Sequence, residues 1–307
     1  MSPITRFESL LQQARAVGPV SAAIIHPVSE VVLRSTLKAR DDGLIRPVLV
    51  GPEGKIRNAA DKAGLDLVGV PVVHTEHSHA AVAEAARLAR EGKVELLVKG
   101  STSTDELMSV LVEADSGMRT GRRMSHVFVM EVATYPKLLL ITDGALNVTP
   151  DLAAKRDIVQ NAIDLGQALG VETPKVAILS AQEKVKPVIP STIDAAALCK
   201  MADRDQITGG VLDGPLAFDN AISADAARMK GIRSPVAGEA DILLAPDLEA
   251  GNLLAKQLAY LASARSAGIV MGARVPIVLT SRSEKEEGRV ISLALGVLVA
   301  HRRRVAP

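Results

Sequence analysis

Aromatic residues are scarce in this chain of 307 residues, where they make up 2% of the sequence and tryptophan is absent. Proteins that hold single-stranded nucleic acids or carbohydrates usually stack the bases or sugars on aromatic side chains. The sequence therefore argues against both classes of binding protein. Its core must be aliphatic, built from Ala, Val, Leu and Ile.

An excess of charge of one sign is also missing, because 36 Lys and Arg residues are balanced by 35 Asp and Glu residues. A chain without a net field has no general attraction to nucleic acid or to an anionic membrane, so we expect neither as a partner. An anionic ligand must then be met by local groups.

Cysteine and long apolar runs are rare as well. Cys199 is the only cysteine, which excludes an intrachain disulfide and a cysteine-rich metal cage and is typical of a reducing compartment. The most apolar stretch, residues 291–300, is about half as long as the ~18 residues of a membrane span. Residues 1–19 carry charges within an amphipathic pattern and lack the apolar core of a signal peptide. We therefore expect a cytoplasmic protein.

What the chain has throughout is an alternation of short aliphatic runs with longer helical patterns. This alternation predicts an α/β fold with a largely parallel sheet and helices on both faces. The expected strands cover residues 21–26, 46–51, 69–75, 95–100, 126–132, 137–144, 175–181, 207–214, 240–246 and 274–281.

The length and the 48% of hydrophobic residues suffice for two domains, with one large domain as the alternative. A first break near Tyr135 and Pro136 gives a first domain of residues 1–135 plus 281–307 and a second of residues 136–280. The helix expected at 285–301 is apolar enough to need burial, and we expect it to pack on the first domain.

Ligands of open α/β sheets bind beyond the carboxyl ends of the strands, and one such end reads KGSTSTDELM. Backbone N–H groups at a helix start, hydroxyls and a nearby lysine together make a phosphate site. The candidates are Lys99, Ser101, Thr102, Ser103 and Thr104. A plain helix cap is the alternative. Walker and G-x-G-x-x-G patterns are absent from the sequence, which weakens a nucleotide or NAD interpretation.

A second candidate segment is the basic loop SGMRTGRRMSH, which holds Arg119, Arg122 and Arg123 between glycines. Guanidinium groups bind phosphate oxygens in pairs, so the loop could close on phosphate or on the diphosphate of coenzyme A. A solvated surface loop is the alternative.

The segment TSRSEKEEG ends an apolar strand with Ser281 and Arg282, followed by Glu284, Glu286 and Glu287. Such groups supply a hydrogen-bond donor, an anion clamp and a base. Alternatively, the acids form the first turn of the last helix, where its dipole favours them. Both interpretations can hold together.

Other strand ends supply Asp143, Asp213 and Asn252 as candidate substrate-binding residues. Two pairs of acids, Asp213 with Asp219 and Asp247 with Glu249, could hold a divalent metal, but they lie on separate loops without a histidine. Structural turns are the commoner explanation, and we expect no metal site.

Several segments resemble the phosphate acetyltransferase and phosphate butyryltransferase family, in one order from about residue 95 to 292. They include KGSTSTDELM, GMRTGRRMSHVFVM, LLITDGALNVTPDLAAK, AILSAQEKVKPVIPSTIDA, GGVLDGPLAFDNAIS, ADILLAPDLEAGNLLAK and PIVLTSRS. GMRTGRRMSHV and SAQEKVKP resemble the butyryl-type branch more closely.

The resemblance implies two three-layer α/β domains with a cleft between them, as in isocitrate and isopropylmalate dehydrogenases, and a homodimer built largely by the second domain. It also implies reversible transfer of a short acyl group (acetyl, propionyl or butyryl) between coenzyme A and inorganic phosphate, by direct thiolate attack on the acyl phosphate. Coenzyme A is then a substrate, and we expect no tightly bound cofactor.

The family's Ser-Arg pair matches Ser281 and Arg282. The serine would donate to the carbonyl oxygen, and the arginine would hold the phosphoryl group or the thiolate. The acetyl-type branch carries an Asp as thiol base where this chain has Gly288, so Glu286 or Glu287 would have to replace it. That branch also has an arginine near the position of Ser109, for which Arg119 is the substitute.

Two other functions stay open at this point. One is an NAD- and metal-dependent dehydrogenase of the same fold, using acids such as Asp213, Asp219 and Asp247. The other is a non-catalytic acyl-CoA binding protein.

Overall fold

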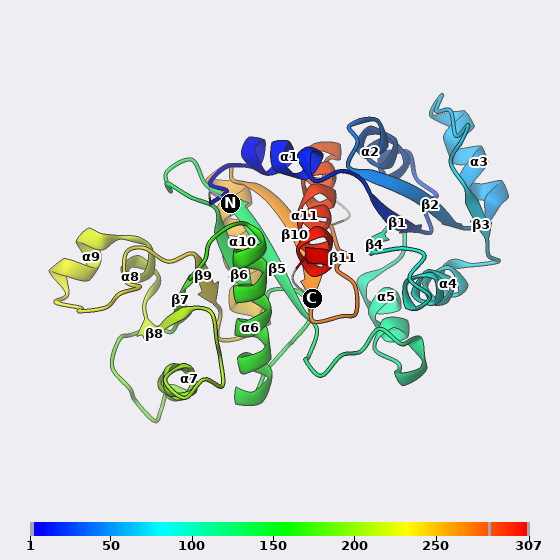
Figure 1. Ribbon diagram of the computed structural model, residues 1–307. Coiled ribbons are helices and arrows are strands. Elements are labelled where there is room, and N and C mark those ends of the chain that lie inside the picture. The colour runs from blue at the N-terminus through cyan, green and yellow to red at the C-terminus, as the bar shows by residue number, and fades with distance from the viewer. Residues whose placement is uncertain (1–2, 282–283, 306–307) are drawn as a thin grey trace. The chain divides into compact units, whose positions relative to one another are not determined.

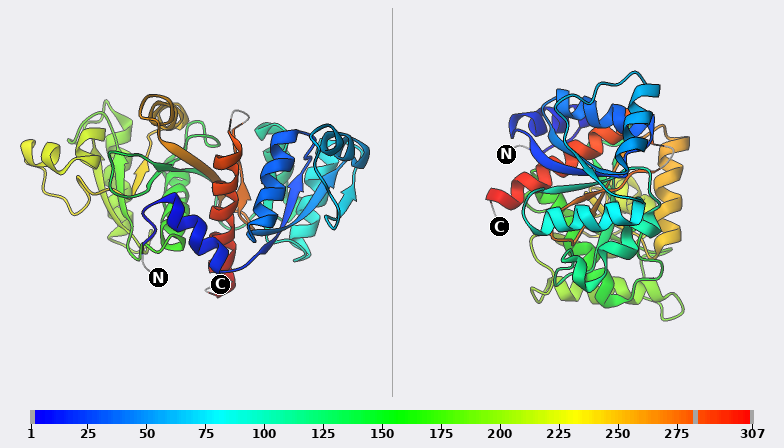
Figure 2. Two further views of the ribbon diagram at one scale, coloured as in Figure 1. Left: turned by 90° about the horizontal axis from the view of Figure 1, so that it is seen from above. Right: turned by 90° about the vertical axis from the view of Figure 1, so that its right-hand side faces the viewer.

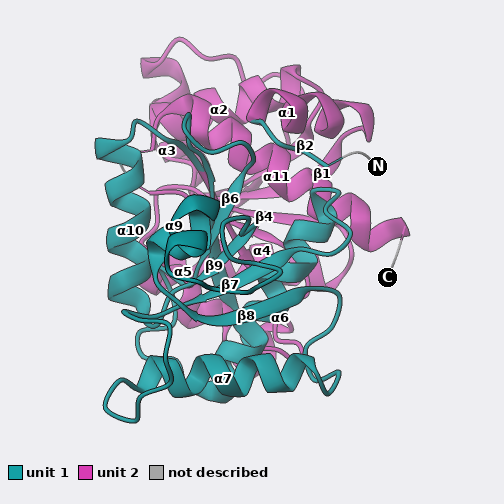
Figure 3. Cartoon of the chain, turned by 90° about the vertical axis from the view of Figure 1, so that its left-hand side faces the viewer, with its two compact units in different colours: residues 1–6, 123–266 teal, residues 7–122, 267–307 magenta. Residues whose placement is uncertain are grey.

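The computed structural model describes residues 3–281 and 284–305, in which strands and helices alternate along the chain (Figure 1). The chain forms two compact units, coloured separately in Figure 3. Unit 1 contains Arg123–Ser266 and the N-terminal segment up to Arg6, and unit 2 contains Phe7–Arg122 and the chain from Ala267 onward. The α/β class predicted from the sequence is confirmed.

Unit 2 is built on strands in the order β3-β2-β1-β4-β11-β10. All neighbours in this order are parallel except β10 and β11, which form an antiparallel hairpin. The strands are β1 (Val20–Ile25), β2 (Ile45–Gly51), β3 (Val72–His74), β4 (Leu96–Lys99), β10 (Arg265–Met271, which begins in unit 1) and β11 (Ile277–Val278).

Helices cover the strands of unit 2 in two layers (Figure 1). One layer consists of α1 (Phe7–Ala16), α2 (Glu30–Asp41) and α11 (Glu286–Val305); the other contains α4 (Ser78–Arg90) and α5 (Thr104–Leu111). The remaining elements are α3 (Glu53–Lys62) and the short 3₁₀ helix η1 (Ala114–Ser116).

Helix α11 is the apolar helix that the sequence predicts at 285–301. Its residues from Gly288 to Ala300 are buried, and it packs against α1 and α2, with α1 beside it in both views of Figure 2. Helix α1 buries Phe7, Leu10 and Ala14, which its amphipathic spacing places on one face.

Unit 1 has the strand order β5-β6-β9-β7-β8, in which β5 is antiparallel to β6 and the other neighbours are parallel. Its strands are β5 (Ser125–Glu131), β6 (Leu139–Thr142), β7 (Lys175–Leu179), β8 (Val211–Leu216) and β9 (Ile242–Leu244). Its helices are α6 (Leu152–Ala168), α7 (Pro190–Ala202), α8 (Phe218–Ile222), α9 (Ala224–Met229) and α10 (Leu248–Leu261). Its core is mainly aliphatic, as the composition predicts.

The units divide after residues 122 and 266, whereas the sequence suggested breaks after residues 135 and 280. Strand pairing explains the difference. Strand β5 pairs with β6 from Val127 to Met130, which places it in unit 1. Strand β10, which was not among the predicted strands, pairs with β11, and this hairpin places most of residues 267–280 in unit 2.

None of the helices among the described residues is long and apolar enough to cross a membrane.

Candidate active site

The carboxyl ends of β1, β4 and β11 form one edge of unit 2. Ile25 is paired with Lys99, and Val98 with Val278, so His26, Gly100 and Thr280 follow in one row at this edge. The chain leaves β1 toward β2 on one side, while β4 lies on the other. This reversal is the topological switch point at which open α/β sheets bind ligands.

Backbone contacts join the loops that follow β1 and β4. The Ser101 N–H donates to the His26 carbonyl at 3.0 Å, and the Ser101 hydroxyl donates to Ser29 Oγ at the same distance. Ser29 precedes α2 and makes no side-chain cap of that helix. Ser101 is exposed, so its hydroxyl lies at the surface of this edge.

The hydroxyls after Ser101 are used to build the start of α5. Ser103 Oγ accepts from the Glu106 N–H at 3.0 Å, and buried Thr102 donates to Glu106 Oε2 at 2.6 Å. Ser78 also donates to Glu106, and the bonds from Ser78 and Thr102 lower the pKa of that carboxyl. The cap interpretation thus holds for Ser103, whereas Ser101 faces solvent and Thr104 is half-buried.

Lys99 is 3% exposed, and its Nζ donates to the Thr280 carbonyl oxygen at 3.3 Å. The structure therefore brings the expected lysine to the end of β11, next to Ser281. Ser281 is exposed, and its carbonyl accepts from the Glu284 N–H at 3.1 Å. Arg282 lies outside the described residues.

Arg289, a buried residue of α11, binds Thr280, Ser281 and Glu284. Its Nη1 donates to Thr280 Oγ1 at 2.8 Å, its Nη2 to the Ser281 carbonyl at 3.0 Å and its Nε to the Glu284 carbonyl at 3.3 Å. Sequence reasoning missed Arg289, although a charged residue beginning the apolar run RVISLALGVLVA is a visible signal.

Glu286 and Glu287 lie in the first turn of α11. Glu286 lines a surface hollow of about 420 Å³ together with residues of α2 such as Arg34 and Lys38. Glu287 is exposed. The alternative interpretation, in which these acids complement the helix dipole, agrees with this position.

His26 is a second residue that sequence reasoning missed. It has a left-handed backbone with φ of 52°, and its Nδ1 atom is buried without a hydrogen-bond partner among the residues that the structure describes. Burial, followed by the charge of Lys55, lowers the pKa of the imidazole, while Glu106 acts in the opposite direction. A strained residue with an unsatisfied nitrogen at a strand end is typical of functional sites.

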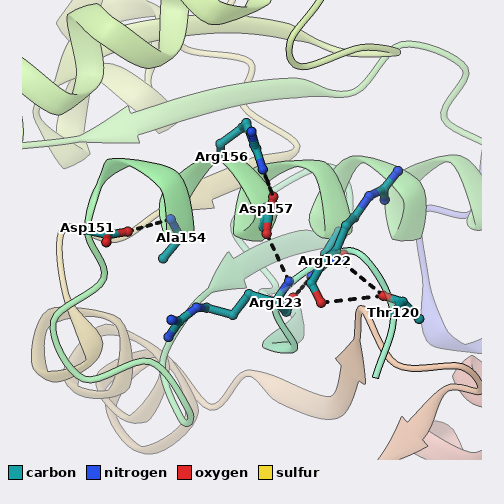
Figure 4. A network of polar contacts seen from close by, with 8 residues as sticks. Thr120, Arg122, Arg123, Asp151, Ala154, Arg156 and Asp157 are labelled. Atoms are coloured by element: carbon teal, nitrogen blue, oxygen red, sulfur yellow. Dashed lines mark hydrogen bonds and ion pairs between the residues drawn. The ribbon is translucent and has the colours of Figure 1, made fainter. Parts of the chain in front are cut away.

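Arg119 lies at the other edge of unit 2. It forms an isolated bridge with Ala273, and the Thr120 hydroxyl donates to the Gly272 carbonyl at 2.6 Å. Gly272 and Ala273 belong to the turn between β10 and β11, at the end of β11 opposite Thr280. Within unit 2, Arg119 is thus separated from Ser101 and Ser281 by the length of β11 and its turn. Arg122 belongs to the same loop, where its N–H donates to Thr120 Oγ1 at 3.2 Å (Figure 4).

The carboxyl end of β6 forms a separate cluster in unit 1. Asp143 is buried and accepts from the N–H groups of Ala145 and Leu146 at 2.9 and 3.0 Å, and from Asn147 Nδ2 at 2.5 Å. Such a fully bonded carboxylate organises the turn that follows β6. Asn252 binds the same turn, donating to the Gly144 carbonyl at 2.9 Å.

Arg123, which sequence reasoning did not separate from Arg119 and Arg122, belongs to this cluster. Its Nη1 donates to Asn147 Oδ1 at 3.3 Å, and its N–H donates to Asp157 on α6 at 3.0 Å (Figure 4). The side chain is exposed. Unit 1 therefore presents an arginine at the carboxyl edge of β6, where an anionic ligand would meet it.

Asp213 does not join this cluster. It pairs with Ala177 inside β8, which extends to Leu216, whereas the sequence suggested a strand that ended at 214. Burial followed by the charge of Asp213 raises the pKa of the Cys199 thiol to about 12.

The acids that a metal-dependent enzyme would need serve other roles. Asp219 pairs with Lys230, and Asp247 caps α10 by accepting from the Ala250 N–H at 2.9 Å. Among the described residues no three or more His, Cys, Asp or Glu side chains are grouped so that they could hold a metal ion.

Comparison with known proteins gives consistent matches over most of the chain. The family model described as phosphate acetyl/butaryl transferase matches residues 75–297. A phosphate acetyltransferase of Rhizobium meliloti is 57% identical over 302 residues, which cover 98% of this chain and 96% of the relative. A phosphate butyryltransferase of Clostridium acetobutylicum is 39% identical over 297 residues, covering 97% and 99%.

These identities correct one expectation from the sequence. The segments GMRTGRRMSHV and SAQEKVKP favoured the butyryl-type branch, yet the acetyltransferase of Rhizobium meliloti is the more similar of the two relatives. The two segments are a small part of the chain, whereas the identities are counted over nearly all of it.

Solved structures agree with the fold. The crystal structure of a branched-chain phosphotransacylase from Enterococcus faecalis V583 has a TM-score of 0.81 at 29% identity, covering 92% of this chain and 99% of that one. A 4-hydroxythreonine-4-phosphate dehydrogenase from Klebsiella pneumoniae has a TM-score of 0.52 at 13% identity, covering 92% and 98%. The second match concerns the fold alone and is consistent with the expected dehydrogenase-like architecture.

Proposed function

Because the chain belongs to the phosphate acetyl/butaryl transferase family, we propose that it transfers a short acyl group reversibly between coenzyme A and inorganic phosphate. The observation that carries the proposal is the carboxyl edge of unit 2, where buried Lys99 contacts the strand end that bears Ser281. A cation and hydroxyls at a switch point suit an anionic substrate.

In the proposed reaction the thiolate sulfur of coenzyme A attacks the carbonyl carbon of the acyl phosphate. A C–S bond forms, the C–O bond to phosphate breaks, and phosphate leaves with the electron pair. Ser281 donates to the carbonyl oxygen as charge develops on it, and Arg282 holds the phosphoryl group. Lys99 and Ser101 contribute to phosphate binding at the same edge.

This reaction needs no enzyme nucleophile, since the acyl phosphate is already activated. Cys199 supports that view, because burial raises the pKa of its thiol to about 12 and keeps it protonated at neutral pH. A direct reaction between two bound substrates is the simplest mechanism for such a site.

The proton of the coenzyme A thiol needs an acceptor, for which we propose Glu287 or His26. Glu287 is exposed in the first turn of α11, whereas Glu286 lines the hollow along α2. His26 has a lowered pKa and is therefore neutral at pH 7, as a base must be. The pH dependence of kcat/KM in Glu287→Gln and His26→Asn variants distinguishes the two. The fall of kcat/KM at acidic pH should disappear only in the variant that lacks the base.

We further propose a cytoplasmic homodimer. Helix α10 supports the dimer, since Leu253, Tyr260 and Leu261 are 68%, 73% and 80% exposed. Large apolar side chains exposed on one helix are typical of an interface.

The test is thioester formation from coenzyme A with acetyl, propionyl and butyryl phosphate. We expect activity that a metal chelator does not abolish, and a sharp loss of turnover in Ser281→Ala. Loss of activity with chelator would favour the dehydrogenase-like alternative. Binding of coenzyme A without thioester formation from any of these acyl phosphates would refute the proposal in favour of a non-catalytic binding protein.

A further inference from the structure

Arg289 is a buried arginine one turn into α11, with 7% of its surface exposed. In the described part of the chain, its donors reach only neutral oxygens: the Thr280 hydroxyl and the carbonyls of Ser281 and Glu284. Thr280 and Ser281 follow β11, and Glu284 precedes α11. The guanidinium thus binds residues at the end of the strand and at the start of the helix.

Among the residues that the structure describes, the charge of Arg289 is not balanced by a direct ion pair. Within residues 3–281 and 284–305, no carboxylate lies at salt-bridge distance from its guanidinium. Burial lowers the pKa of Arg289, and the charge of Glu284 only partly opposes this effect. Taking a charge out of water without a partner destabilises a fold.

The neighbouring strand β4 adds a second cation beside Thr280. Lys99 is buried and donates to the Thr280 carbonyl, while Arg289 donates to the Thr280 hydroxyl. Two positive charges therefore meet at one threonine, at the edge of the sheet where an anion would bind. A fixed cation pair of this kind is already oriented when the substrate arrives.

We propose that Arg289 is a positioning residue of the acyl-transfer site, which holds Thr280, Ser281 and Glu284 in place and whose buried charge is balanced by the anion that binds there. The activity measurement that tests this inference rests on the proposed function. The anion-binding measurement does not, because it uses inorganic phosphate as the probe.

A specific pair of effects follows. In the absence of phosphate the buried charge lowers the stability of the fold, and bound phosphate relieves this cost. Phosphate should therefore raise the Tm of the wild type more than chloride of equal ionic strength does. Arg289→Met, which keeps much of the volume but not the charge, should lose this phosphate-specific shift.

The activity should change in the same direction. We expect Arg289→Met to lower kcat about 10²-fold, the loss typical of removing one preorganised polar group from an active site. The KM for coenzyme A should stay nearly constant, because Arg289 acts on Thr280 and Ser281 rather than on that substrate. Arg289→Lys keeps the positive charge but cannot donate to all three oxygens in the same way. This variant should retain the rise in Tm caused by phosphate and should recover only part of kcat.

Arg303 offers a matched control at the opposite edge of unit 2. Its Nη1 donates to the carbonyls of Ala273 and Arg274 at 3.0 and 2.9 Å, so it too is an arginine bound to backbone oxygens. Arg303→Met is the same chemical change at a site away from Thr280. It should leave kcat and the phosphate shift as in the wild type.

The outcomes separate the two proposals. Wild-type kcat and phosphate shift in Arg289→Met would overturn the inference, as would equal losses in Arg303→Met. If Arg289→Met does not fold, Thr280→Val removes the hydroxyl acceptor with little change in shape; an unchanged kcat and shift in that variant would overturn the inference equally. If the wild type transfers no acyl group, the proposed function fails, while the phosphate shift still decides the role of Arg289.

Discussion

The backbone of Gly100 lies directly against the carbonyl oxygen of Ile25, to which the Gly100 N–H donates a hydrogen bond of 2.9 Å. A Cβ atom at Gly100 would lie 2.1 Å from that oxygen and 2.9 Å from the carbonyl oxygen of His26. Only glycine lets the ends of β1 and β4 approach so closely. This contact sets the spacing of the row formed by His26, Gly100 and Thr280.

Gly100→Ala should therefore separate the two strand ends. We expect a loss of roughly 1–3 kcal/mol of stability, the usual cost of forcing an extra carbon into a packed site, together with reduced turnover. Denaturant unfolding and the thioester assay measure the two effects. Gly54→Ala on α3 is the control, since its new Cβ meets nothing within 4 Å and should be neutral or stabilise the helix. Equal stabilities of the two variants would contradict the prediction.

His26 should make stability depend on pH. Its folded-state pKa lies below 6.5, so the unfolded chain binds the proton more tightly, and stability is lost as pH falls from 6.5 through the folded-state pKa. His26→Asn removes this loss, and asparagine tolerates the left-handed backbone. Measured by denaturant unfolding, the variant should gain stability relative to the wild type between pH 7.5 and pH 5. The charged groups that act on the imidazole are Lys55 and Glu106. If the stability difference between the variant and the wild type is the same at pH 7.5 and pH 5, the proposed contribution of His26 is excluded.

The Cys199 thiol should be unreactive in the folded protein. Burial raises its pKa to about 12, so thiolate is scarce at pH 8. A thiol reagent should modify the native protein far more slowly than the protein in denaturant, and activity should survive the exposure. Rapid modification of the native protein with loss of turnover would show instead that Cys199 lies in the path of the substrate.

Helix α10 should decide the oligomeric state. Replacing Tyr260 and Leu261 by glutamate puts charges on the exposed apolar face, and we expect a dimer to become a monomer with an intact circular dichroism spectrum. Size-exclusion chromatography with light scattering reports the mass. Val68→Glu is the control, because Val68 is 82% exposed in unit 2. A wild-type protein that is already monomeric would contradict the proposed dimer interface on α10.

Most of the fold was predictable because its strands are short and strongly aliphatic. The runs SAAIIH and RPVLVG, for instance, became β1 (Val20–Ile25) and β2 (Ile45–Gly51) with shifts of about one residue. Strand β10 was missed because RSAGIVM contains small residues and lacks a clear period. Residues 265–271 form a strand because they pair with β11, and a local sequence pattern does not predict this pairing.

The location of the candidate site residues was predictable only as far as strand ends identify it, and their roles stay predictions. The carboxyl-end rule selects Lys99, Ser101 and Ser281, and the structure places these residues at one edge of unit 2. The same rule does not predict which basic residues come near. Arg119 pairs with the turn at the far end of β11, whereas Arg123, four residues later, contacts Asn147 in unit 1. When the residues of one loop belong to two units, the sequence alone does not show which residue belongs to which unit.

The chain order of unit 2 has a consequence during synthesis. Strand β4 is buried in the finished fold, yet its neighbour β11 is synthesised only after the whole of Arg123–Ser266. Throughout that interval the nascent chain presents an apolar strand edge without a partner, which invites aggregation. Unit 1 is nearly continuous in sequence and can fold during the wait. We therefore expect ribosome-associated chaperones to matter most for β4.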